Sequence, residues 1–423
     1  MNSHRKSISC ESLSLYLMTT ISRHAARPKR IFPPETFWLC LVIFPVIFAA
    51  VICSAFTSPK SFKQATQATP ITEDSLVAIT ISFIGDLMCH SPQYNNARQS
   101  DGTYDFYPSF EQVKPYFKTA DYVIGNLETT FAGPARGYSG YPNFNTPDSY
   151  AAALKASGVD MLVTSNNHSM DMGEAGLLRT LEILDREGIA HTGTFRSKKD
   201  RDSVCVIDFN WMKVGVLNFT YGTNGAYPSA SHAYMLNVTD SALVTRDIKS
   251  ARAQGADIVV VFYHWGAEYK PEPVAKQDSM MKYAVAAGAD LIIGAHSHVI
   301  GPVDYYKTKN ARLDSGVVAW SLGNFISNQS QRYTDAGLIL QIELSKNTTN
   351  NTVWISRTTY VPTWVYRGYD LSNKNYIVVP ATWCGKDSLP AWISVESKTK
   401  MCGVLEDTKK IVTKYSAKPV VCE

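Results

Sequence analysis

The sequence has little charge and few cysteines for its length. Charged residues make up 18% of its 423 positions, below the ~25% that is usual for soluble globular proteins. Lys and Arg exceed Asp and Glu by only 41 to 37, too small a surplus for a nucleic-acid binder. The eight cysteines include no Cys-x-x-Cys pair, which argues against a zinc ribbon and a disulfide scaffold. We therefore expect no nucleic-acid partner and no structural zinc.

A long apolar run lies near the N-terminus. Residues 37–56 contain no charged side chain, and a helix needs ~20 apolar residues to cross a bilayer. The preceding segment, 1–36, is rich in Lys and Arg, which favours a cytoplasmic location for it. The pattern predicts a single-pass anchor in the cell membrane, with the main domain extracytoplasmic. A cleaved signal peptide is the alternative, although this run is longer and starts later than is usual.

The remaining chain divides by composition. Residues 57–75 are polar and rich in Pro, Thr and Gln, as expected of an extended linker. Residues 76–370 are expected to form the folded domain, and 371–423 an irregular C-terminal extension. Within that extension, Cys384 and Cys402 either form a disulfide or remain buried thiols.

Apolar runs of strand length alternate with helix-length segments along the main domain. The expected strands are 77–84, 121–126, 159–164, 213–219, 257–263, 289–295, 316–321 and 337–344. The expected helices are 146–157, 173–188, 239–255 and 274–288. Such alternation predicts an α/β layered fold. The last strands have no helices between them, which indicates a partly antiparallel sheet.

Polar residues follow the expected strands at the point where each ends. They form the clusters Gly85-Asp86 with His90, Gly125-Asn126-Leu127-Glu128, Asn166-Asn167-His168 with Asp171, His264-Trp265-Gly266 with Glu268, His296-Ser297-His298, and Ser321-Leu322-Gly323-Asn324-Phe325. Five of the nine histidines lie in these clusters. Because ligands bind outside the carboxyl ends of strands in open α/β sheets, we expect these side chains to form one site.

The chemistry of these side chains favours divalent metals. Neutral imidazole with carboxylate and amide oxygens suits Mn, Zn or Fe, and two such ions together can support phosphoryl transfer. We predict Asp86, His296 and His298 as ligands of one ion, and Glu128, Asn167 and His264 as ligands of a second. His168, with Asp171 nearby, is the predicted catalytic acid or orienting group.

Each cluster taken alone also fits a structural role. Asp86 would serve equally well as a helix cap, and a single histidine after a strand is often a hydrogen-bonded core residue. His296 and His298 are stronger candidates, since alternate residues of an extended segment lie on the same side. The joint pattern favours a site.

These motifs, taken in order, resemble those of the CapA family of bacterial capsule, or poly-γ-glutamate, synthesis proteins. The resemblance extends over roughly residues 77–365, and the N-terminal anchor also suits that family. It implies a role in polymer synthesis and export, with membrane-embedded synthase or export subunits and an anionic polymer such as polyglutamate as partners.

The CapA family is in turn similar to the calcineurin-like metallophosphoesterases. That similarity implies a four-layer α/β/β/α sandwich with a two-metal site. The sequence departs from the phosphoesterase pattern at Asp-x-His, because Leu87 and Met88 follow Asp86. Two interpretations of function therefore stay open: an accessory component of capsule export without turnover, or a metal-dependent hydrolase of phosphoesters or polymer bonds at the outer face of the membrane.

Overall fold

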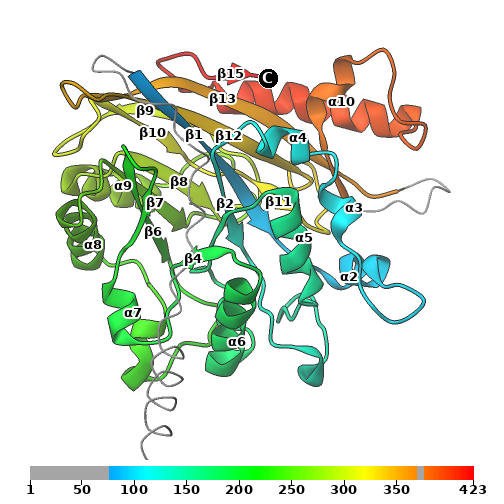
Figure 1. Cartoon of the computed structure of the whole chain (residues 1–423). Helices are drawn as coiled ribbons and strands as arrows, with labels where there is room; N and C mark the ends of the chain where they lie inside the picture. Colours follow the sequence, from blue (N-terminus) through cyan, green and yellow to red (C-terminus); the bar gives the residue numbers. More distant parts are fainter. Residues whose placement is uncertain (1–75, 369–375) are drawn as a thin grey trace, which may run out of the picture. The chain divides into compact units, whose positions relative to one another are not determined.

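The computed structural model describes residues 76–368 and 376–423. In this part of the chain, two mixed β-sheets pack together, and helices cover their outer faces (Figure 1). The predicted span 37–56, the segment 1–36 and the linker 57–75 all lie outside the described residues. Among the residues that are described, no helix combines the length and the apolar character that a membrane crossing requires.

The first sheet has nine strands among the described residues, in the order β14-β13-β12-β1-β2-β3-β4, with β11 paired to β1 and β15 to β13. The bounds are β1 Leu76–Leu87, β2 Tyr122–Leu127, β3 Met161–Val163, β4 Ala190–Thr192, β11 Asn324–Ile326, β12 Ala336–Asn347, β13 Val353–Tyr366, β14 Ile377–Pro380 and β15 Val421–Cys422. Strands β1 to β4 run parallel, whereas β12, β13 and β14 pair antiparallel. The expectation of a partly antiparallel sheet is confirmed.

The second sheet has six strands in the described chain, in the order β5-β6-β7-β8-β10-β9. The bounds are β5 Cys205–Asp208, β6 Lys213–Thr220, β7 Ile258–His264, β8 Leu291–Ala295, β9 Val303–Lys307 and β10 Ser315–Ala319. Strands β6, β7, β8 and β10 are parallel. Their carboxyl ends therefore lie at one edge of the sheet.

Helices connect most of the parallel strands. The bounds are α2 Ser91–Ala97, α3 Tyr107–Phe110, α4 Lys114–Phe117, α5 Ser149–Ser157, α6 Gly173–Arg186, α7 Lys198–Asp202, α8 Ser241–Ala253, α9 Ala275–Ala287 and α10 Val395–Val412. Each of the four helices expected from the sequence is present, as α5, α6, α8 and α9. A crossover is needed because the chain must return from the carboxyl end of one strand to the amino end of the next parallel strand.

Strand β7 shows how the sequence produces the layers. Val260 and Phe262 belong to the core between the two sheets, whereas Val259 and Val261 pack with helices α8 and α9 on the other face. Successive side chains of a strand point to opposite faces, so a continuous apolar run predicts a strand that is buried on both sides. A separate core joins the outer face of the first sheet to α5 and α6. The order of layers in the described chain is thus α/β/β/α.

The C-terminal segment is not irregular, and our expectation for it was wrong. Strands β14 and β15 both pair with β13, and α10 packs against β13 and β14. The prolines that suggested irregular structure lie at element boundaries: Pro380 ends β14, Pro390 precedes α10 and Pro419 precedes β15. A proline at the end of a strand need not interrupt its ladder. Cys384 and Cys402 form a disulfide, which decides between the two alternatives for this pair.

Candidate metal centre

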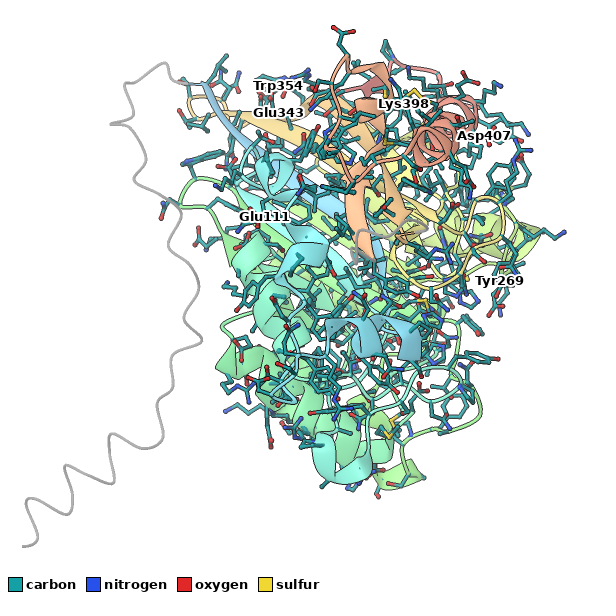
Figure 2. The ribbon with its side chains drawn as sticks, turned by 90° about the vertical axis from the view of Figure 1, so that its right-hand side faces the viewer. Glu111, Tyr269, Glu343, Trp354, Lys398 and Asp407 are labelled. Carbon is teal, nitrogen blue, oxygen red and sulfur yellow. A yellow bond between two sulfur atoms is a disulfide. The ribbon has the colours of Figure 1, made fainter. Side chains whose placement is uncertain are left out.

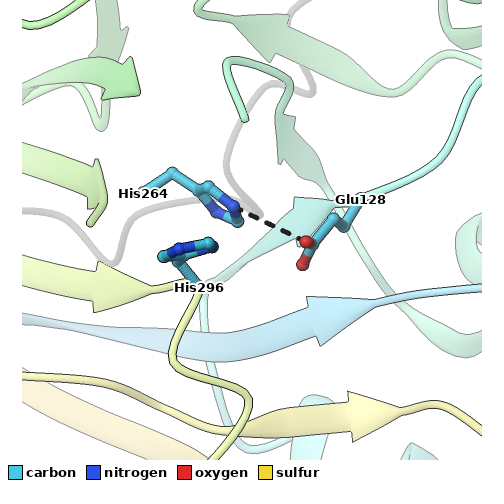
Figure 3. Close-up of side chains that lie close together, drawn as sticks. All are labelled: Glu128, His264 and His296. Carbon is cyan, nitrogen blue, oxygen red and sulfur yellow. Dashed lines mark ion pairs between the residues drawn. The ribbon is translucent and has the colours of Figure 1, made fainter. Parts of the chain in front are cut away.

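The predicted site residues lie where the carboxyl ends of the parallel strands meet. Asp86 is near the end of β1, Glu128 follows β2, His264 ends β7, and His296 and His298 follow β8. All five side chains are buried. Figure 3 shows Glu128, which follows a strand of the first sheet, close to His264 and His296, which come from the second. The site is therefore assembled from both sheets.

A close backbone approach places Asp86. The backbone N–H of Asp86 donates to the carbonyl of Gly323, at 2.9 Å. A Cβ atom at Gly85 would lie 2.0 Å from the same carbonyl oxygen, so only glycine fits at this position. Two segments that are distant in the sequence, Gly85-Asp86 and Gly323-Asn324, thus lie side by side.

Asp86 has polar partners on both carboxylate oxygens. Oδ1 accepts from the Asn126 amide at 2.8 Å, and Oδ2 lies 3.2 Å from Nδ1 of His298. The same nitrogen of His298 lies 3.1 Å from Oδ1 of Asn324. Asn126 also approaches Nδ1 of His264, at 3.3 Å. These contacts orient the side chains across the junction of the two sheets.

Glu128 is different, because its carboxylate has no hydrogen-bond partner on either oxygen among the described residues. Its Oε1 lies 3.5 Å from Nε2 of His264 and 3.8 Å from Nε2 of His298. Burial raises the pKa of Glu128 well above its usual value, and the charge of Asp86 raises it further. A buried carboxylate without a donor is costly, so this position favours a cation.

His264 and His296 are held in the neutral form by their surroundings. Burial, followed by the charges of the neighbouring histidines, lowers the pKa of His264 well below its usual value. Burial likewise lowers the pKa of His296 to about 3. Nδ1 of His296 has no hydrogen-bond partner in the described chain. Neutral imidazole is the form that binds metals.

Three overlapping groups of side chains bring one ligand atom each within 4.8 Å of one another. They are Glu128 with His264 and His296, Asp86 with Glu128 and His298, and Glu268 with His296 and His298. Glu128 belongs to both of the first two groups.

The structure brings the predicted second-ion ligands together. Oδ1 of Asn167 lies 2.7 Å from Nε2 of His264, and Glu128 lies beside the same nitrogen. For the other ion, Asp86 and His298 share a group, but His296 groups with Glu128 and His264 instead of with Asp86. The assignment of ligands to each ion stays a prediction.

His168 and Asp171 form a buried pair beside these groups. Nδ1 of His168 lies 2.8 Å from Oδ2 of Asp171, and this oxygen also accepts from the backbone N–H of Phe144 at 2.7 Å. The Asn224 amide nitrogen lies 3.3 Å from Nε2 of His168. A carboxylate that holds one ring nitrogen fixes the tautomer and direction of a histidine.

Several residues that shape the site had no predicted role. Asn126 and Asn324 orient Asp86 and His298, and Glu268 belongs to a candidate group. All three stood in the strand-end clusters, which was the signal available. Tyr221, whose ring centroid lies 4.5 Å from that of His296, had no such signal. His90 belongs to none of the three groups.

The chain is similar to curated proteins of capsule synthesis. It is 28% identical over 318 residues to the capsule biosynthesis protein CapA of Bacillus anthracis, a match that covers 73% of each chain. It is 27% identical over 313 residues to the PGA biosynthesis protein CapA of Bacillus subtilis, covering 73% of this chain and 76% of that one.

Solved structures of lower similarity include a nucleotidase and a phosphoesterase. The NAD nucleotidase NadN of Haemophilus influenzae has 13% identity and a TM-score of 0.45, with 80% of this chain and 64% of that one covered. The calcineurin-like phosphoesterase YfkN of Bacillus subtilis has 12% identity and a TM-score of 0.40, with 79% and 100% covered. The family assignment instead comes from the sequence: residues 80–329 match the model of the bacterial capsule synthesis protein family PGA_cap, and the chain belongs to that family.

Proposed function

We propose that this protein is a membrane-anchored, extracytoplasmic component of poly-γ-glutamate capsule synthesis and export, and that its strand-end site is a divalent-metal hydrolase centre. The two CapA relatives, whose names specify capsule and PGA biosynthesis, support the first part. The bond cleaved is a phosphoester or a bond of the polymer.

One observation carries the metal assignment. Both oxygens of Glu128 are buried without a hydrogen-bond donor among the described residues, and Oε1 lies 3.5 Å from Nε2 of His264, which ends β7, and 3.8 Å from Nε2 of His298, which follows β8. Asp86 and Glu268 add like charge to the same place. Such an arrangement is unfavourable for the protein alone and becomes favourable when a cation binds.

The residues present fit a pair of divalent ions. Glu128, Asn167 and His264 would hold one ion, and Asp86 and His298 the other, with His296 within reach of ligands from either set. The donors are imidazole nitrogens and carboxylate or amide oxygens, which suit Mn, Zn or Fe. When bound, two such ions stabilise the attacking and leaving oxygens of a displacement.

The His168 and Asp171 pair supplies the proton chemistry. Asp171 accepts the Nδ1 proton of His168, which leaves Nε2 to accept a hydrogen bond from the Asn224 amide. A proton taken up at Nε2 can then be donated to a leaving group. Asp171 stabilises the protonated ring, as the carboxylate does in other His-carboxylate pairs.

The anchor explains how the domain stays with its partners. Residues 37–56 would place it at the outer surface, beside membrane-embedded synthase or export subunits and the anionic polymer they release.

The alternative function is an accessory component that binds metal or polymer without turnover. It is favoured by the departure from Asp-x-His after Asp86, because the histidine expected there is absent.

The first test is metal content by inductively coupled plasma mass spectrometry on the full-length chain in mild detergent. We expect one or two transition-metal ions per chain, lost in the His296→Ala/His298→Ala double variant. His232→Ala is a matched control, since His232 pairs with Glu174 outside the three candidate groups. A wild-type chain without metal after incubation with Mn²⁺ or Zn²⁺ would contradict the proposal.

Turnover is tested with the same preparations. Hydrolysis of an aryl phosphate or of poly-γ-glutamate by the wild-type chain, and its loss in the double variant, supports the hydrolase. Bound metal without cleavage of either substrate, together with normal capsule export by the double variant in cells, supports the accessory function.

A further inference from the structure

A carboxylate outside the predicted ligand set lies beside the histidines of the site. Glu268 is in the loop after β7, and its side chain is exposed. One of its oxygens and one ring nitrogen each of His296 and His298 all lie within 4.8 Å of one another. The two histidines are buried and come from the loop after β8. Glu268 thus approaches them from the solvent side.

The backbone holds Glu268 in this place. The N–H of Tyr269 donates to the carbonyl of Ser297 at 2.7 Å, which ties the loop after β7 to the residue between the two histidines. Tyr269 has a φ of +63°, and His296 and His298 have φ values of +93° and +57°. Residues other than glycine adopt this region at a cost, and such residues concentrate at functional sites.

The groups around Glu268 would be stabilised by a bound cation. Its carboxylate has no ion-pair partner among the described residues, and its charge adds to that of Asp86 in raising the pKa of Glu128. Burial and the Glu268 charge raise the pKa of Tyr221 to about 12. On the inner side, Nδ1 of His296 is buried without a described partner. Carboxylates and neutral imidazole therefore converge on one position.

Glu272, four residues along the same loop, shows what an ordinary surface carboxylate does here. It pairs with Lys414 and accepts a hydrogen bond from Tyr415 at 2.6 Å, so its charge is already compensated. Figure 2 shows Tyr269, the neighbour of Glu268, at the outside of the molecule. The two exposed acids of this loop thus differ in whether the described protein supplies a positively charged partner, since Glu268 has only a hydrogen bond with the Tyr269 side chain.

We propose that Glu268 is a solvent-side ligand of the metal centre, which binds a divalent ion together with His296 and His298. This inference rests on the proposed metal site. Because Glu268 is exposed, its carboxylate is the ligand that an incoming anionic group can displace while the buried ligands stay in place. The ion would then be open to substrate on the side from which the substrate arrives.

The test is Mn²⁺ binding to the full-length chain, measured by isothermal titration calorimetry and by the electron paramagnetic resonance signal of free Mn²⁺. We compare wild type with Glu268→Gln, Glu268→Asp and the matched control Glu272→Gln. Glu268→Gln is expected to lower the affinity for one Mn²⁺ ion by on the order of tenfold, the lower end for perturbed metal sites. The stoichiometry of the more tightly bound ion should stay unchanged. Glu272→Gln should bind as wild type does.

Glu268→Asp separates ligation from long-range attraction. The shorter side chain keeps the charge but moves the carboxylate oxygens away from the histidines. If Glu268 is a ligand, Glu268→Asp should therefore lower the Mn²⁺ affinity almost as much as Glu268→Gln does. Wild-type affinity in Glu268→Asp, or in Glu268→Gln, would overturn the inference while the metal site itself stands. If the wild-type chain binds no Mn²⁺, the proposed function has failed instead. Circular dichroism of each variant confirms folding.

Discussion

Two fully buried carboxylates lie at opposite ends of the parallel strands, and the protein compensates only one of them. Asp290, just before β8, accepts three backbone hydrogen bonds and pairs with Arg252. Glu128, just after β2, has no described donor on either oxygen. A buried charge is tolerated when it is paired and hydrogen-bonded. Asp290 is therefore compensated within the protein, whereas Glu128 has no described donor, as expected if it binds the proposed cation.

Asp171 is intermediate between the two. It accepts from the backbone N–H of Phe144 and from the ring of His168, so it is satisfied by a partner that can itself gain a proton. Three buried carboxylates of one fold thus differ in their partners: Asp290 has backbone donors and an arginine, Asp171 has a backbone donor and a histidine, and Glu128 has no described donor.

The largest expected effect is on folding. Asp290→Asn removes the charge that Arg252 faces, and breaking a buried pair costs about 3–5 kcal/mol. We expect urea unfolding at neutral pH to show this loss, with metal content per folded chain unchanged. Asp314→Asn is the control, because Asp314 is an exposed acid of a nearby loop. If Asp290→Asn lowers the free energy of unfolding no more than the control does, the partners of Asp290 do not stabilise the fold, and the contrast with Glu128 fails.

The next effect is on turnover. Asp171→Asn keeps the shape of the side chain but no longer stabilises a protonated His168. We expect kcat on an aryl phosphate to fall by about 100-fold, the lower range for general acid–base catalysis, with little change in KM or in bound metal. Glu174→Gln changes a half-buried acid that pairs with His232, and this variant should behave as wild type. Equal rates in the two variants would exclude the proposed role of Asp171.

Glu128→Gln is expected to lower metal affinity without destabilising the metal-free chain, whereas Asp290→Asn destabilises the chain without changing its metal content. The metal affinity should fall by about 10- to 100-fold. The free energy of unfolding in EDTA should stay equal or rise, since the amide lacks the charge that Asp86 repels. Calorimetric Mn²⁺ titration and urea unfolding of the metal-free chain measure the two quantities. Destabilisation of the metal-free variant would show that Glu128 is structural, like Asp290.

The last effect is a pH dependence of the stability of the metal-free protein. His296 has a pKa of about 3 when folded and about 6.5 when unfolded. Between these values the unfolded chain binds a proton that the folded chain does not. The contribution of His296 to stability is therefore complete above about pH 6.5 and decreases as the pH falls towards 3.

This dependence is measured by urea unfolding in EDTA from pH 7 to pH 4. The difference between wild type and His296→Asn isolates His296 from Glu128, whose raised pKa acts with the opposite sign. His232→Asn is the control. Parallel curves for wild type and His296→Asn would show that His296 is not held neutral.

Much of the fold could be predicted because its signals are local. The eight expected strands and four expected helices are all present, since an apolar run such as that of β7 packs against a core on both faces. Short strands such as β4 and β11 were missed because three residues carry too little pattern. Strand β13, of 14 residues, was missed as well, because its first half alternates irregularly between exposed and buried positions. The tail was misjudged because β14 and β15 form only by pairing with the distant β13.

The site could be predicted as a set of residues but not as a geometry. Asp86, Glu128, Asn167, His264, His296 and His298 were singled out because each follows a strand, and the structure brings their side chains together. That His296 groups with His264 depends on the pairing of β7 with β8. That Glu268 lies near His296 and His298 depends on the tertiary contacts of the loop after β7, which include the backbone hydrogen bond from Tyr269 to Ser297.

By itself, the sequence determined the alternation of strands and helices and the kinds of ligand at the strand ends, because apolar periodicity and residue chemistry are local properties. Only the tertiary structure decided which carboxylates have partners. Asp290 and Glu128 are both acids next to apolar strands, and nothing nearby in the sequence separates them. The difference arises from donors far along the chain, at Arg252 and Leu313, and such distances are set only when the sheets pack.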